Sequence, residues 1–205
     1  MSTLKVNNLS SVDGSSDISL TTPLSGSYRT GQVIEELHSM CNKTSLHGRA
    51  TIENVTAAQL LTTTYADATG SKIQNYTPPV GTKTLVYEFM PSLYWQGAHA
   101  ISHWKMYFAT DGDSGYTEVT KARHNQSGYY PESKPIFRWV FELGASSADT
   151  TAGVFTEDRP NLYLKWIARD YSVSGNGRHL HGTIYWDGTS GNQFSLPSIS
   201  IKAIA

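Results

Sequence analysis

From residue 49 to the C-terminus, apolar side chains alternate with polar ones, and this period of two limits the fold more than any other feature of the chain. Side chains of a β-strand point alternately to its two faces, so this period predicts strands with one face on a core. Leu85, Tyr87 and Phe89 form one such set. Strands are predicted at about 49–55, 59–66, 82–90, 101–109, 116–123, 136–143, 161–169, 179–186 and 193–204.

Turns rich in Gly, Pro and Asp separate these predicted strands, for example at 111–115 and 187–191. No helical periodicity interrupts the run. Many strands joined by short turns are typical of an antiparallel β-sandwich, most simply a jelly-roll-like one. We therefore expect an all-β head domain over residues 49–205.

Residues 1–27 differ from the head, because they are dominated by Ser, Thr, Asn, Asp and Gly, with isolated apolar residues. Such a segment has too few apolar side chains to form a core of its own, so it becomes ordered only against another surface. We interpret residues 1–27 as an attachment segment, with Leu4, Val6 and Leu9 as its contact residues.

The spacing of apolar residues over 30–41 predicts one short α-helix. Thr30 is a suitable N-cap, and Val33, Leu37 and Met40 recur on one helical face. A helix of about three turns is marginal in isolation, so this face must be covered. It packs either on its own subunit or around a symmetry axis, where Val33, Leu37 and Met40 would form the oligomer interface. Residues 28–48 then connect the attachment segment to the head.

Charge and composition exclude several classes of partner. The chain has 16 Lys and Arg against 17 Asp and Glu, a net charge of -1, and no basic block, so we expect no nucleic-acid partner. It has neither the apolar stretch of a signal peptide nor that of a membrane span, so we expect no membrane insertion. Its single cysteine, Cys41, excludes an internal disulfide and reads as a core residue.

No motif in the sequence predicts catalysis. Glycoside hydrolysis needs two carboxylates at a fixed separation, and nothing in the spacing of Glu88, Glu142, Asp170 and Asp187 pairs them. The chain contains no Gly-x-Ser-x-Gly turn for a nucleophilic serine. We therefore predict a noncatalytic protein without a cofactor, and keep a polysaccharide-degrading enzyme only as a distant alternative.

Three arrangements of residues are candidate metal sites. His179 and His181 would share one face of a strand, and His99 and His103 would be neighbours only in a helix, where a strand is expected. The turn at 111–115 lacks the further ligands of a calcium loop. For all three, surface or loop residues are the favoured interpretation, so no metal is predicted. If His179 and His181 of three subunits met at an axis, they could form a transition-metal or anion site.

Aromatic residues are abundant, with 12 Tyr, 5 Trp and 6 Phe, and several stand where strands should end. Exposed rings beside amides suit a sugar face or a protein interface, because they offer a large contact area at little entropic cost. The predicted binding set is Tyr94, Trp95, Gln96, Tyr129 and Tyr130. The alternative is that these rings pack between subunits or cap the sandwich.

Four segments carry a resemblance: Ser-Thr-Leu-Lys-Val-Asn-Asn-Leu at 2–9, the predicted helix at 30–41, the run at 75–89, and Tyr-Trp-Asp-Gly at 185–188. Together they resemble small virion structural proteins, similar to tail-fibre proteins, of marine tailed bacteriophages such as cyanophages and pelagiphages. The resemblance implies a trimeric fibre or spike component whose N-terminus docks on the particle. It supplies no catalytic residue.

These observations predict a noncatalytic virion protein, made in the host cytoplasm and assembled as a homotrimer, that adheres to the host surface from the tail. Its partners would be other virion proteins, through residues 1–27, and a host surface glycan or protein. Many weak identical contacts, multiplied by valency, suit such adhesion. Decoration of the capsid surface, or a head fibre, is the alternative role.

Overall fold

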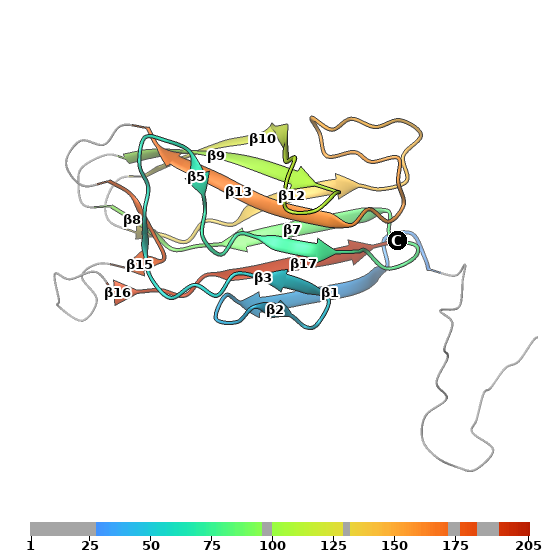
Figure 1. The fold of residues 1–205 in the computed structure, drawn as a ribbon, viewed down its shortest axis with the longest axis horizontal. Coiled ribbons are helices and arrows are strands. Elements are labelled where there is room, and N and C mark those ends of the chain that lie inside the picture. The colour runs from blue at the N-terminus through green and yellow to red at the C-terminus, as the bar shows by residue number, and fades with distance from the viewer. Residues whose placement is uncertain (1–27, 96–99, 129–131, 172–176, 184–192) are drawn as a thin grey trace, which may run out of the picture.

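The computed structural model describes residues 28–95, 100–128, 132–171, 177–183 and 193–205 (Figure 1). Within these ranges the secondary structure is β-strand, with no α-helix, and all pairings between its strands are antiparallel. The prediction of an antiparallel all-β protein is confirmed. The attachment residues Leu4, Val6 and Leu9 lie outside the described residues.

Two large sheets form most of the molecule. The first has the order β1 (Val33–Met40), β17 (Ser198–Ile204), β7 (Thr84–Met90) and β12 (Phe137–Glu142). The second has the order β10 (Thr117–Gly128), β9 (Ala100–Ala109), β13 (Leu162–Asp170), β6 (Ile73–Tyr76), β3 (Ala50–Ile52) and β2 (Ser45–Leu46), while β5 (Ala66–Asp67) also pairs with β13.

Two small sheets complete the fold. One has the order β11 (Glu132–Ser133), β8 (Leu93–Tyr94), β14 (His179–Leu180) and β4 (Gln59–Leu60). The other pairs β15 (Gly182–Thr183) with β16 (Gln193–Phe194). The labels β8, β15 and β16 lie together at the end of the molecule opposite the C-terminus (Figure 1).

The long strands pair in a nested order along the chain. β1 pairs with β17, β6 with β13, β7 with β12, and β9 with β10. This is the pattern of one long hairpin that turns back between β9 and β10. Two further pairings, β17 with β7 and β13 with β9, place neighbouring strand pairs of that hairpin side by side in the same sheet. The hairpin is thereby rolled into two sheets.

Aromatic rings from the inner faces of both sheets form the core. Phe137 of β12 stacks on Trp104 of β9, with ring centroids 3.8 Å apart, and lies 5.6 Å from the ring of Trp166 on β13. Phe108 of β9 meets Phe141 of β12 edge to face. Each of these contacts joins one sheet to the other, so alternate residues of each strand are held in a shared apolar layer.

The helix predicted over residues 30–41 is wrong, because residues 33–40 form strand β1. Leu37 packs against the core, while Met40 points to the opposite face of the strand and is exposed. Val33, Leu37 and Met40 therefore do not form one stripe. The physical reason is that the local apolar spacing suits either element, and a strand gains a full antiparallel ladder with β17, which a marginal helix cannot match.

Residues 33–46 are part of the main sheets, through β1 and β2, rather than a connecting helix. The next residue, Cys41, is buried, and its Sγ lies 3.4 Å from the carbonyl oxygen of Gly70. Burial raises the pKa of this thiol to about 12. The interpretation of Cys41 as a core residue is confirmed, and its thiol stays protonated and unreactive.

Two adjacent residues of β12 test whether its side chains point alternately to the core and to the outer face. Phe141→Ala removes a fully buried ring that packs against Phe108 and Phe155, so it should lower the free energy of unfolding by about 3–5 kcal/mol. Val140→Thr changes an exposed side chain on the other face and should change it by less than about 0.5 kcal/mol. Urea unfolding measures both, and equal losses would contradict the assigned faces.

Candidate functional site

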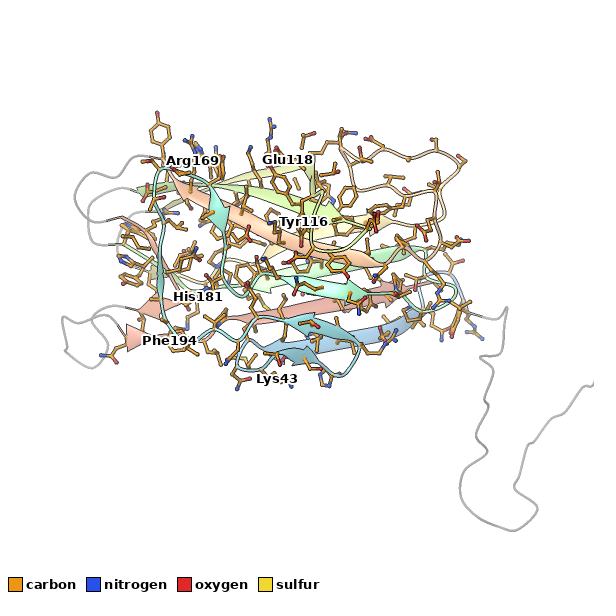
Figure 2. All side chains as sticks on the ribbon, viewed as in Figure 1. Lys43, Tyr116, Glu118, Arg169, His181 and Phe194 are labelled. Atoms are coloured by element: carbon orange, nitrogen blue, oxygen red, sulfur yellow. The ribbon has the colours of Figure 1, made fainter. Side chains whose placement is uncertain are left out.

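The two ends of the molecule differ. The N–H of Gly31 donates to the carbonyl of Ala205 at 2.7 Å, and the N–H of Ala205 donates to that of Gln32 at 2.9 Å, so the start of the described chain and its C-terminus meet. At the opposite end lie the small sheets, and Figure 2 places His181 and Phe194 there. We describe this second end, which we call the distal end, as the candidate site.

A buried arginine is the centre of the distal end. The side chain of Arg178 is fully enclosed, and its Nη1 donates to Ser102 Oγ at 2.7 Å and to the carbonyl of Gln126. Its backbone N–H donates to Asp170 Oδ2 at 2.9 Å. Its guanidinium carbon lies 4.6 Å from the ring centroid of Trp95. Through its side chain and its backbone N–H, Arg178 therefore connects the ends of β9, β10 and β13 to the start of β14.

Burial lowers the pKa of Arg178 to about 10, and the nearby carboxylate of Asp170 opposes that shift. The guanidinium thus stays charged at neutral pH. A buried charge is tolerated only when it is paired and hydrogen-bonded, and Asp170, Ser102 and Gln126 meet that need. This arrangement holds the strand ends in place.

The rings of Tyr94 and Trp95 are only 1% and 2% exposed. Tyr94 stacks on the imidazole of His179, with ring centroids 4.7 Å apart and an interplanar angle of 8°. The expectation of exposed rings at these two positions is therefore wrong, because the register of β8 with β14 turns Tyr94 onto His179 while Trp95 covers Arg178. Gln96, Tyr129 and Tyr130 lie outside the described residues.

His179 and His181 do not share a face. β14 ends at Leu180, and His181 adopts a left-handed backbone with φ of 61°. Its buried Nε2 donates to the carbonyl of Thr69 at 2.7 Å, which makes Nδ1 the acceptor nitrogen of a neutral ring. Burial lowers the pKa of His181 to about 4 and also lowers that of His179. Within the described ranges, no group of three or more His, Cys, Asp or Glu side chains could hold a metal ion.

The other candidate carboxylates and histidines lie apart from one another. Glu88 faces Arg138 across β7 and β12 and is bonded to it, while Glu142 lies four residues further along β12. This offset corresponds to about 13 Å, more than the 5–9.5 Å that glycoside hydrolysis uses. His103 Nδ1 lies 3.1 Å from Arg169 Nη2. His99 and Asp187 fall outside the described residues.

The comparisons with known proteins identify no relative: no family model matches the chain, and no curated protein matches it. In the described part of the chain, no helix is long and apolar enough to span a membrane.

Arg178→Gln should be strongly destabilising, because it removes one charge from a buried network and leaves Asp170 without its counter-charge. We expect the free energy of unfolding to fall by about 3 kcal/mol. The matched control is Arg159→Gln, which removes a single bond from an exposed arginine to the carbonyl of Pro78 and should cost less than about 1 kcal/mol. Urea unfolding of both variants measures the difference, and similar losses would contradict the central role of Arg178.

His181 should make stability depend on pH. Its folded pKa of about 4 lies below the ordinary histidine pKa of 6.5, so the unfolded chain binds more protons between these values. Stability is then complete above about pH 6.5 and falls by roughly 3 kcal/mol as the pH drops to about 4. His179 contributes with the same sign. His181→Asn, which tolerates a positive φ, should flatten this slope in unfolding titrations, and an unchanged slope would contradict the role of His181.

Proposed function

We propose that this chain is a noncatalytic virion structural protein of a tailed bacteriophage, acting as a trimeric tail-fibre or spike-like component that adheres to the host surface. Its body would be a jelly roll. The observation that carries the proposal is the separation of the two ends: the chain that follows residues 1–27 enters the sheets beside the C-terminus, and the distal end lies at the far side (Figure 1).

The nested strand pairing supports the jelly-roll assignment. A jelly roll contains two Greek keys, and a long hairpin rolled into two sheets produces them. The pairings β1 with β17, β6 with β13, β7 with β12 and β9 with β10 follow that scheme. Jelly rolls occur in viral capsid proteins and lectins. This support is an analogy at the level of the fold, since one fold hosts many functions.

The separation of the ends supports an attachment role. A protein that joins a particle and contacts a host must present two different surfaces at a distance from each other. The long strands run between the ends, and the distal strand ends are held by the buried Arg178 network. A rigid body of this kind would pass force from the host contact to the particle without needing a catalytic centre.

The outer face of the first sheet supports the homotrimer. Met40 of β1 and Val140 of β12 are each 47% exposed on this face, and Val33 at the start of β1 is 46% exposed. Of the residues predicted to form the oligomer interface, Val33 and Met40 are therefore available for contact between subunits, whereas Leu37 serves the core. These exposed apolar side chains stand beside the ion pairs Glu88–Arg138 and Glu36–Lys202 of the same face, and a second copy could contact them together.

Decoration of the capsid surface remains the second candidate, since the same two-ended body would serve there. Degradation of a polysaccharide is the third, and the offset of Glu88 from Glu142 weighs against it. Location on the particle separates the first two candidates.

Particles of the phage that encodes this chain provide the test. Gold-labelled antibodies against the described body should bind the tail, and particles carrying a chain without residues 1–27 should lose the label. The truncated chain should still fold, with an unfolding midpoint close to that of the full chain, because the first strand of the described residues begins at Val33. Label on the head shell would favour decoration, and continued incorporation of the truncated chain would refute the attachment role of residues 1–27.

A further inference from the structure

A groove of about 480 Å³ lies at the distal end, between β11 and the hairpin of β15 and β16. Figure 2 places Phe194, one of its residues, on this part of the molecule. The volume of the groove lies within the range of small-molecule sites. Its lining residues are Glu132, Lys134, Thr183, Gln193, Phe194 and Ser195.

The hairpin side of the groove is fixed to the body of the protein. Gly182 of β15 lies against the ring of Tyr94, and a Cβ atom at this position would overlap that ring, so only glycine allows so close an approach. The N–H of Ser195 donates to the carbonyl of His181 at 2.9 Å, and Ser195 Oγ lies 2.8 Å from Ser92 Oγ. The groove is therefore formed before a ligand binds, which lowers the entropic cost of binding.

One aromatic ring of the groove is open to solvent. Phe194 of β16 is 46% exposed, so its ring offers a flat apolar surface on which the C–H face of a pyranose can lie. Gln193 and Ser195 flank Phe194 along the chain and bring an amide and a hydroxyl group to the same groove. A flat ring with polar groups around it suits a ligand that is apolar on one face and hydroxylated at its edge.

The groove also contains two opposite charges that do not pair with each other. Glu132 and Lys134 both line it, and among the described residues neither has an ion-pair partner. Glu132 accepts from Thr183 Oγ1 through Oε2 at 2.5 Å, which orients the carboxylate and leaves Oε1 as an open acceptor. The ammonium of Lys134 is an open donor. The groove therefore offers one acceptor and one donor at balanced charge.

We propose that this groove binds a neutral hexopyranose of a surface glycan. The C–H face of the sugar would lie on Phe194, a hydroxyl group would donate to Oε1 of Glu132, and the ammonium of Lys134 would donate to a hydroxyl or ring oxygen. The balanced charge disfavours an ionic ligand, and the two polar groups disfavour a purely apolar one. The inference rests on the proposed function for its source of glycan, and it names the class of ligand that the distal end takes.

Saturation-transfer difference NMR on the full chain tests this proposal, with the methyl glycosides of D-glucose, D-galactose and D-mannose as probes. At least one of them should bind in a saturable way at millimolar concentration, because an open groove with one ring and two polar groups gives a small binding free energy. Its ring protons should receive more saturation than its methyl group, since they face Phe194. Cyclohexanol, which has an apolar ring and a single hydroxyl group, should bind at least about fivefold more weakly.

Two variants remove features of the groove, and each has a matched control outside it. Phe194→Ser removes the ring and should lower the affinity more than about tenfold, while Tyr171→Ser removes another exposed ring and should leave it unchanged. Glu132→Gln removes the charged acceptor and should lower the affinity about tenfold, while Glu142→Gln changes an exposed carboxylate elsewhere and should leave it unchanged. Urea unfolding checks that all four variants fold.

Three results would overturn the proposal: no saturable binding of any of the three glycosides, equally strong binding of cyclohexanol, or an unchanged affinity of Phe194→Ser. These results are distinct from a failure of the proposed function. A chain that is labelled on the tail but binds no glycoside refutes the role of the groove alone. A chain that binds a glycoside through Phe194 but is absent from the particle refutes the virion role alone.

Discussion

The contact between the two aromatic layers is the interaction on which the other features depend. Phe137 lies between Trp104 and Trp166, so a ring of one sheet is held by two rings of the other. A sheet must bury one face to be stable, and here each large sheet is the cover of the other. The nested pairing of the chain agrees with this contact, because a hairpin rolled on itself brings β12 over β9 and β13.

Much of the strand pattern could be predicted, because the period of two is a local property. The prediction of a strand at 136–143 corresponds to β12, and that at 82–90 to β7. The segment at 30–41 could not be assigned in this way. Its apolar spacing suits both elements, and the decision is made by β17, whose residues are more than 150 positions away along the chain. Local spacing contains no information about that partner.

The distal end was harder to predict for the same reason. The burial of Arg178 depends on Ser102, Gln126 and Asp170, which stand on three different strands. No sequence motif joins these residues, and an arginine after a glycine-rich turn reads as a surface residue. The sequence shows that Tyr94 and Trp95 stand near a strand end, but their burial depends on the register of β8 with β14.

The two large sheets end at the edge strands β10 and β12, and these edges are not closed by pairing with each other. Two facing sheets of finite width must end somewhere, and an uncovered edge strand invites pairing with another chain. Here the bulge at 120–123 interrupts the edge of β10 and places Lys121 and Arg123 beside it. Bulges and charges both prevent edge-to-edge association. The bulge in β10 therefore combines both forms of protection at one sheet edge.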